Sequence, residues 1–389
     1  MRFGRALAVV TLALALAGCE KKEKAAAPAA APAPDTILIG HVASMSGEQA
    51  TFGQSTDNAI RLAINEVNAK GGIKGKKIAL KTYDDQGKPE EAAIAATRLI
   101  VNDKVMVLLG EVASSRSLAI APIADQNKVP QISPTSTNPR VTKDGDKTRP
   151  YVFRVCFIDP FQGTVMAKFA RENLKVAKAA ILRDVGNDYS VGLADYFAKK
   201  FQELGGTIVS DQSFKAGDQD FKAQLTAIKN KKPELVYIPA YYTDVALAGR
   251  QARELGIKVP LAGGDGWDST KLYEIAQGAL DGSFFSNHYT HESPEPRVQD
   301  FVKKYKEAYG QIPDALAALG YDAALVAFDA MGRASELTGP AIRDALERTK
   351  EFPGVAGVIT IDQDHNAVKS AVVIGIEKNA PKYVATVNP

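Results

Sequence analysis

The sequence predicts an α/β protein built from two doubly wound sheets of parallel strands. From residue 37 onward, short apolar segments alternate with longer segments whose apolar residues recur at helical spacing, the order typical of a parallel sheet covered by helices. The same alternation starts again after residue 160. About 355 residues follow Pro34, which exceeds the size at which a single core stops growing, so we expect two domains.

The first unit reads β-α-β-α-β-α-β. Its segment 54–69 has helical spacing and ends at a pair of glycines, and its segment 105–109 is a continuous apolar run, as expected for a central parallel strand. In chain order, the expected strands and helices are 37–42, 54–69, 78–83, 88–102, 105–109, 114–127 and 129–132.

The second unit repeats the alternation without repeating the sequence. Its expected helices and strands are 161–173, 179–183, 193–204, 207–214, 221–229, 235–239, 245–255 and 261–263. Helices at 298–309 and 315–335 then precede strands 357–362 and 371–376, which we expect to pair with each other. Because ligands of such sheets bind at the carboxyl ends of the strands, we expect a cleft between two lobes.

The N-terminus has the features of an exported lipoprotein precursor. Arg2 and Arg5 precede an apolar stretch, 6–17, which is shorter than the roughly 20 residues of a membrane-spanning helix. The run Leu-Ala-Gly-Cys19 resembles a bacterial lipobox, so we expect 1–18 to be a cleaved signal and Cys19 to be acylated. An ordinary signal peptide is the alternative. Residues 19–34 would then be the lipidated cysteine followed by an Ala/Pro-rich linker. This linker is expected to reach up to about 45 Å from the membrane.

Composition and motifs argue against several classes of protein. Apolar content of 45%, charged content of 24% and a net charge of +3 are those of an ordinary globular chain and predict no nucleic-acid partner. There is no Gly-x-Ser-x-Gly elbow, no phosphate-binding loop and no metal spacing around His288 and His291, which we expect to be exposed or capping residues. We therefore expect no enzyme, no cofactor and no metal. Cys156, without a disulfide partner if Cys19 is acylated, should be a buried, inert thiol.

Three loops suit a small zwitterion instead. The segment 110–115 ends a buried strand and opens a helix, where free N–H groups and Ser114 suit a carboxylate, although simple N-capping is the alternative. The hydroxyl-rich segment 132–139 follows the neighbouring strand. In the second unit, 263–268 presents Asp265, which suits an ammonium group. A hydrolase using Asp265 and Ser114 is a rival hypothesis, but no base is placed for it.

Aromatic residues follow other strands of both units. Tyr189 and the pair Tyr241-Tyr242 lie after second-unit strands, and Phe52 follows the first strand of the chain. Such rings can cover an apolar ligand body, whereas each alone would be ordinary packing.

These segments together resemble the leucine/isoleucine/valine-binding proteins of ABC importers, from about Ile37 to Ile376. The resemblance is carried by Met45-Ser46-Gly47, Phe52-Gly53, the stretch 64–75 (INEVNAKGGIKG), Tyr83-Asp84-Asp85, Ile132-Ser133-Pro134, Thr137-Asn138-Pro139 and Arg250-Gln251-Ala252-Arg253 with Gly256.

The resemblance implies a type I periplasmic binding protein, with two lobes joined by three hinge crossings. The crossings are expected near 157–160, 286–289 and 354–360. Lobe 1 would then comprise 35–157 and 288–355, and lobe 2 would comprise 158–287 and 356–389.

The resemblance also implies that the lobes close on one free amino acid, branched-chain or otherwise small and aliphatic. Its carboxylate would be held by Ser114, Thr135 and Thr137, its ammonium by Asp265, and its side chain by Phe52, Tyr189 and Tyr241. The implied protein is a monomeric, non-catalytic receptor of the periplasm or cell envelope, whose partner is a membrane permease.

The sequence departs from the family at several positions. Gly87 and Ala113 stand where better-known members carry a disulfide, and Asp265 stands where glutamate is common. Trp267 and Arg116 are possible specificity residues: Arg116 either contacts a second carboxylate of the ligand or faces solvent. An amide, a short carboxylate or an aromatic acid is therefore the alternative ligand.

Overall fold

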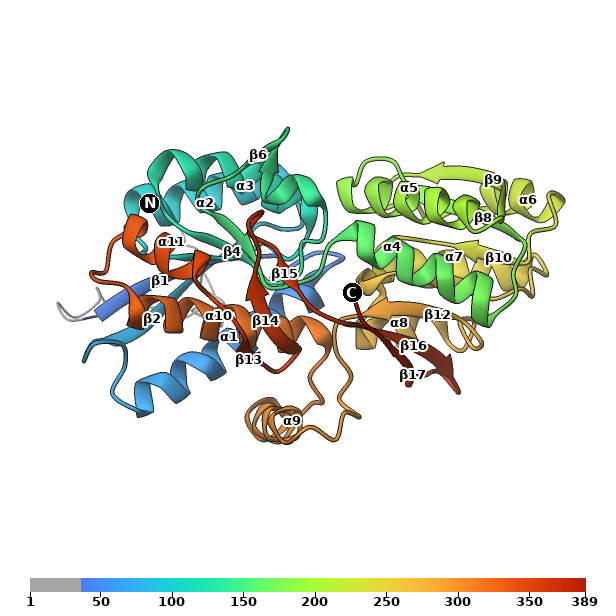
Figure 1. Ribbon diagram of the computed structural model, residues 1–389. Coiled ribbons are helices and arrows are strands. Elements are labelled where there is room, and N and C mark those ends of the chain that lie inside the picture. Colours follow the sequence, from blue (N-terminus) through green and yellow to red (C-terminus); the bar gives the residue numbers. More distant parts are fainter. Residues whose placement is uncertain (1–35) are drawn as a thin grey trace, which may run out of the picture.

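The computed structural model describes residues 36–389 as two α/β lobes (Figure 1). The first lobe combines blue and cyan elements with orange ones from late in the chain, and the second combines green and yellow elements with the dark-red C-terminal strands. The expected signal 1–18, Cys19 and the linker to residue 34 lie outside the described residues.

The first sheet is entirely parallel, in the order β2-β1-β3-β4-β7. Its strands are β1 Thr36–Ala43, β2 Lys77–Asp84, β3 Leu108–Leu109, β4 Gln131–Ser133 and β7 Val152–Arg154. Its helices are α1 Ala50–Ala69, α2 Pro89–Thr97 (continued by a π-helical turn, Arg98–Asn102), α3 Ser114–Asn127, α9 Pro296–Tyr309, α10 Ala315–Arg333 and α11 Gly339–Glu347. A 3-10 turn, Pro139–Val141, and a small hairpin, β5 Lys143–Asp144 and β6 Lys147–Thr148, precede β7.

The first lobe's core forms where α1 and α10 pack together over the sheet. Both helices bury a broad apolar face, and Gly320 lets them approach, because a Cβ there would lie 2.7 Å from the Cγ2 of Thr56. Among residues 36–389, α10 is the one helix long and apolar enough to span a membrane by composition, and 83% of its apolar window is buried. It therefore has the character of a core helix.

The second sheet has the order β17-β16-β12-β11-β10-β8-β9. Five strands are parallel, and the last two of the chain add an antiparallel edge. The strands are β8 Lys178–Asp184, β9 Thr207–Phe214, β10 Leu235–Tyr237, β11 Leu261–Gly263, β12 Phe284–Asn287, β16 Ala371–Glu377 and β17 Ala380–Val387. The helices are α4 Asp159–Lys168 (continued by a π-helical turn, Phe169–Asn173), α5 Asp188–Glu203, α6 Lys222–Asn230, α7 Tyr242–Glu254 and α8 Thr270–Ala276, with a 3-10 turn, Asp265–Trp267 (η4).

The predicted fold class is confirmed, because both lobes contain a doubly wound parallel sheet with the same switch in strand order. One strand pairing is wrong. β14 (Gly357–Ile361) pairs with β13 (Phe352–Gly354) and β15 (Ala367–Val368), whereas β16 pairs with β12 and β17. Apolar alternation identifies a strand but carries no information about its partner, which is chosen by packing far along the chain.

The chain passes between the lobes three times. It leaves the first lobe after β7, returns after β12 and crosses again between β15 and β16. The third crossing lies beyond the expected 354–360 and beyond the expected lobe boundary at 355. Residues up to β15 pack on the first lobe, where the N–H of Arg154 donates to the carbonyl of His365.

Candidate ligand-binding site

A small cavity of about 20 Å³ lies between the facing carboxyl edges of the two sheets. It is lined by Phe52, Val112, Ser114, Thr135, Tyr189, Tyr241, Asp265, Gly266 and Leu316. Six of the seven residues expected from sequence to bind ligand are in this lining. A space of this size holds little more than one water molecule, so the side chains around it would have to move apart for a ligand.

Strand topology brings these side chains together. Three first-lobe segments contribute, after β1, β3 and β4, and three second-lobe segments contribute, after β8, β10 and β11. In both sheets these are the strands around the point where the strand order reverses, so their carboxyl ends leave a crevice. Leu316 arrives from α10 in the last third of the chain, and the local sequence carries no signal for it.

Ser114 presents hydrogen-bond donors at one end of the cavity. It is the first residue of α3, and its Oγ accepts from the backbone N–H of Asn138 at 3.2 Å. Its own hydroxyl proton is therefore free to be donated. The first N–H groups of a helix have no acceptor within the helix and carry partial positive charge, so this end of the cavity suits an anion.

Thr135 and Thr137 have different surroundings. The hydroxyl of Thr135 lines the cavity and donates to the carbonyl of Val112 at 2.7 Å, so only its lone pairs remain for a ligand. Thr137 is fully buried and is not in the lining. It lies instead beside Asp159 of the second lobe. Burial raises the pKa of Asp159 to about 8, and the neighbouring Thr137 hydroxyl opposes this rise.

Asp265 is the acidic residue of the lining. Its Oδ2 lies 2.8 Å from Nε2 of His288, whereas its Oδ1 is buried and has no hydrogen-bond partner among the described residues. A buried carboxylate oxygen without a partner is costly, and it marks the point where a cation would be stabilised. The expectation that His288 is an exposed or capping residue is wrong, since its side chain is buried.

Aromatic rings form the apolar wall. The rings of Tyr189 and Tyr241 are stacked, with centroids 5.4 Å apart and planes 4° apart, and Phe52 meets Tyr241 edge-on at 5.6 Å. The hydroxyl of Tyr189 accepts from the N–H of Gly266 at 3.1 Å, which ties the wall to the loop bearing Asp265. Two apolar side chains, from Val112 and Leu316, complete the lining.

Trp267 supports the site from behind. Its side chain is fully buried, outside the lining, and its Nε1 donates to the carbonyl of Ile238 at 2.9 Å. A Cβ on Gly263 would lie 2.1 Å from that Nε1, so the glycine makes room for the indole.

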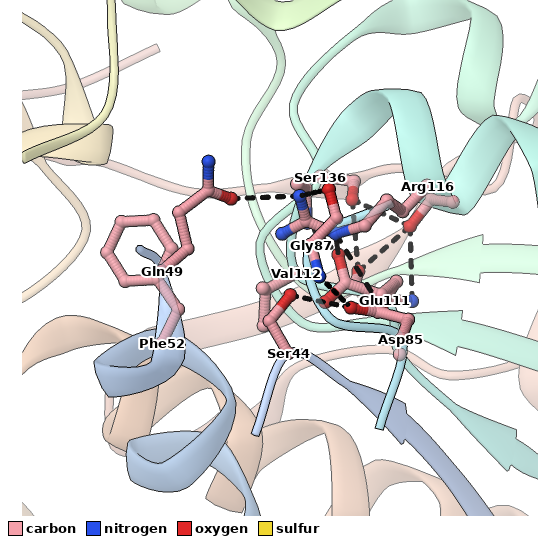
Figure 2. Close-up of polar contacts among 12 residues, drawn as sticks. Ser44, Gln49, Phe52, Asp85, Gly87, Glu111, Val112, Arg116 and Ser136 are labelled. Carbon is pink, nitrogen blue, oxygen red and sulfur yellow. Dashed lines mark hydrogen bonds and ion pairs between the residues drawn. The ribbon is translucent and has the colours of Figure 1, made fainter. Parts of the chain in front are cut away.

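Arg116 is buried rather than solvent-facing. Its Nε donates to Glu111 at 2.8 Å and its Nη1 to the Gln49 side chain at 2.8 Å, as Figure 2 shows. It lies outside the cavity lining. Sequence reasoning missed this cluster. Glu111 lies just after the apolar strand β3 and five residues before Arg116, and an apolar strand gives no reason to expect a buried ion pair at its end.

The Glu111–Arg116 cluster is a tightly buried charge network (Figure 2). Asp85 adds a second carboxylate 3.7 Å from Nε of Arg116. Burial raises the pKa of Glu111 to about 7, with Arg116 opposing and Asp85 reinforcing the rise. The network also connects Gly87 and Ala113, the two positions where better-known members of the family carry a disulfide. The N–H of Ala113 donates to Glu111 at 2.6 Å, and the carbonyl of Gly87 accepts from Arg116 at 3.4 Å.

The two lobes are closed on each other around the cavity. The hydroxyls of Thr51 and Ser269 lie 2.9 Å apart across the cleft. The N–H of Asp188 donates to Ser115 Oγ at 2.9 Å, and the amide of Asn138 donates to the carbonyl of Asp188 at 2.8 Å. These contacts join residues of different lobes, so they exist only when the cleft is shut.

The site places neutral hydrogen-bond donors on one lobe and a carboxylate on the other, around a largely apolar space. Among residues 36–389 no cluster of three metal-ligating side chains occurs, and Cys156 is a buried thiol whose pKa burial raises to about 12. Donors on one lobe, a carboxylate on the other and an aromatic wall between them define a ligand-binding clamp of two α/β lobes.

The chain belongs to the periplasmic binding protein family, which it matches over residues 36–381. It is 32% identical over 325 residues to the Leu/Ile/Val-binding protein BraC3 of Rhizobium johnstonii, covering 83% of this chain and 87% of that one. A leucine binding protein from Thermotoga maritima has a TM-score of 0.86 and 42% identity, covering 91% of this chain and 99% of that one. A branched-chain amino acid transporter substrate binding protein from Streptococcus pneumoniae, in complex with isoleucine, has a TM-score of 0.85 and 33% identity, covering 91% and 100%. The family and fold implied by the sequence resemblance are therefore confirmed.

Proposed function

We propose that this protein is the extracytoplasmic substrate-binding component of an ABC importer, and that its lobes close on one free amino acid with a branched-chain or other small aliphatic side chain. The observation that carries the proposal is Asp265: it lines a cavity that has anion-binding donors on the opposite lobe, and its Oδ1 is buried without a hydrogen-bond partner among residues 36–389. Relatives that bind leucine, isoleucine or valine support it.

The ligand's α-carboxylate would bind at Ser114. The free hydroxyl proton and the first N–H groups of α3 supply donors there, and the helix dipole favours negative charge.

The ammonium group would bind between the two lobes' acceptors. Oδ1 of Asp265 is one acceptor, and Thr135 is the other, because its hydroxyl proton is already used and only lone pairs remain. This assigns Thr135 to the ammonium rather than to the carboxylate expected from sequence. Thr137 has no role at the ligand in this assignment, since its side chain lies outside the lining.

The side chain would lie against Phe52, Tyr189 and Tyr241. These rings, with Val112 and Leu316, make an apolar and small space. An aliphatic side chain gains from burial there, while a charged one would lose its hydration without a partner.

Closure follows from how the contacts are divided. A ligand shifts an equilibrium only through a difference in affinity between two states. The carboxylate donors belong to the first lobe and Asp265 to the second, so a zwitterion satisfies both only when the cleft is shut. In this proposal the protein catalyses no reaction of its ligand. Its closed form would be the one that docks on the permease.

Cys19 would be acylated and would anchor the protein in the cell envelope, with 20–34 as a tether. Replacing Cys19 by serine should move the protein from the detergent phase to the aqueous phase in a detergent-partition assay of cells. A wild-type protein found entirely in the aqueous phase would contradict the anchor and leave the binding proposal untouched.

The deciding experiment for binding is isothermal titration of the chain from residue 35. The protein is first unfolded and refolded to remove carried ligand, then titrated with leucine, isoleucine, valine and alanine, followed by the other amino acids. Saturable one-to-one binding of an aliphatic amino acid is expected. If correctly refolded protein binds no free amino acid, the zwitterion clamp is wrong, and amides, short carboxylates and aromatic acids become the ligands to test.

A further inference from the structure

The two carboxylate oxygens of Asp265, a residue of the cavity lining, have different surroundings. Its Oδ2 lies 2.8 Å from His288 Nε2, and its Oδ1 has no partner among residues 36–389. His288 is absent from the cavity lining, so it reaches the ligand only through Asp265. A carboxylate only accepts hydrogen bonds, which places the imidazole proton on Nε2.

The imidazole is itself held firmly. It is 4% exposed, and its ring is stacked on Phe157 with centroids 3.6 Å apart and planes 26° apart. Burial lowers the pKa of His288, which keeps the ring neutral at neutral pH. The charged groups that act on it are Asp265 from η4 and Lys369 from the connection between β15 and β16.

The same residues lie where the lobes are joined. His288 immediately follows β12, where the chain leaves the second lobe, and Phe157 lies between β7 and α4, where the chain enters it. Lys369 lies at the third crossing. The orientation of Asp265 is therefore tied to the geometry of the crossings rather than only to its own loop.

We propose that His288 is a positioning residue for the ligand's ammonium group: its Nε2–H fixes one oxygen of Asp265 at the hinge and leaves the other available to accept from the ammonium. The proposal rests on the proposed function, since it needs a cationic ligand group. Without this hydrogen bond the Asp265 side chain is free to rotate, and ammonium binding weakens although every residue of the lining is unchanged.

Two substitutions separate this role from packing. His288→Leu keeps the volume and removes the donor, whereas His288→Gln keeps an amide N–H that can reach Asp265. Measured by titration with leucine, H288L should weaken binding roughly 10- to 100-fold, and H288Q should recover most of it. In an Asp265→Asn background, H288L should cause little further loss of leucine binding, because His288 acts through Asp265. This loss is measured as the decrease in thermal stabilisation by millimolar leucine.

A second measurement does not depend on ligand affinity. The ¹⁵N spectrum of the labelled imidazole in ligand-free wild-type protein should show the Nε2–H tautomer at neutral pH. Should H288L fail to fold, His288→Asn replaces it, since the shorter amide cannot reach Asp265.

The outcomes are distinct. The positioning role of His288 is wrong if wild-type protein and H288L bind leucine equally well. It is also wrong if H288L weakens leucine binding by the same factor in the wild-type and in the Asp265→Asn background. An Nδ1–H tautomer also overturns it. Absence of any amino-acid binding by refolded wild-type protein, with the Nε2–H tautomer present, contradicts the proposed function instead.

Discussion

At the scale of single residues, Asp265 trades stability for binding. Among residues 36–389 its buried Oδ1 has no hydrogen-bond partner, which costs free energy in the ligand-free closed protein, while an ammonium group there would remove that cost. A residue with this role has opposite effects on folding and on binding.

We therefore predict that Asp265→Asn keeps the shape of the site but lowers affinity for an amino acid more than about 100-fold, because a buried ammonium would lose its countercharge. The melting temperature without ligand should stay the same or rise. Titration and thermal unfolding of the same preparation check both, and a variant that binds normally would show that the ligand has no ammonium at this position.

At the scale of elements, the connection between β3 and α3 joins a buried charge network to the end of the cavity that we propose binds the ligand's carboxylate. Glu111 follows the strand and Ser114 begins the helix. Arg116, two residues later, reaches back to Glu111 and across to Gln49, the residue before α1 (Figure 2). The protonation of Glu111 should therefore affect the stability of this connection.

The pKa of Glu111 is about 7 in the folded protein and about 4.5 unfolded. The folded state thus binds more protons between these values, so the stabilisation is complete below about pH 4.5 and is lost as pH rises through 7. We predict that Glu111→Gln flattens the fall in melting temperature between pH 5 and 8. Glu307→Gln, at an exposed position of α9 in no ion pair, is the control and should leave that slope unchanged.

The loop from β11 to η4 depends on close packing between Gly263 and Trp267. We predict that Gly263→Ala lowers the free energy of unfolding by about 1–3 kcal/mol, since its Cβ would collide with an indole that is already hydrogen-bonded in place. Gly332→Ala is the matched control: no atom lies within 4 Å of its Cβ, and alanine favours its helix by up to about 1 kcal/mol. Urea unfolding measures both, and equal stability of the two variants would contradict the packing argument.

At the scale of the whole molecule, the proposed function requires that a ligand link the two lobes into one clamp. Besides the packing of Phe52 on Tyr241 and an exposed ion pair between Arg140 and Asp188, the contacts across the cleft are a few hydrogen bonds among hydroxyl, amide and backbone groups. Individually such bonds add only about 0.5–1.5 kcal/mol. We infer that they hold the closed state weakly without ligand.

We predict that saturating amino acid reduces the radius of gyration in solution scattering and raises the melting temperature by several degrees, with about 2.7 kcal/mol of stabilisation at a ligand concentration of one hundred times Kd. Asp265→Asn at the same concentration should show neither change. A scattering curve that ligand leaves unaltered, in protein that titration shows to bind, would mean that the cleft is already closed.

The sequence by itself determined the fold class and placed the loops of the cleft. Helical and strand periodicity are local signals, and strand ends in parallel sheets meet at one edge, so the loops that line the cavity could be assigned to one cleft. The family resemblance then selected Ser114, Thr135, Tyr189, Tyr241 and Asp265 within those loops, and the structure places all five in the lining.

Only the tertiary structure decided how those residues are used. Burial of Arg116, the exclusion of Thr137 from the lining, the late third crossing and the hold of His288 on Asp265 all depend on partners distant in sequence. Periodicity reports which face of an element is apolar, whereas hydrogen-bond partners are set by where separate elements meet in space, which no single segment encodes.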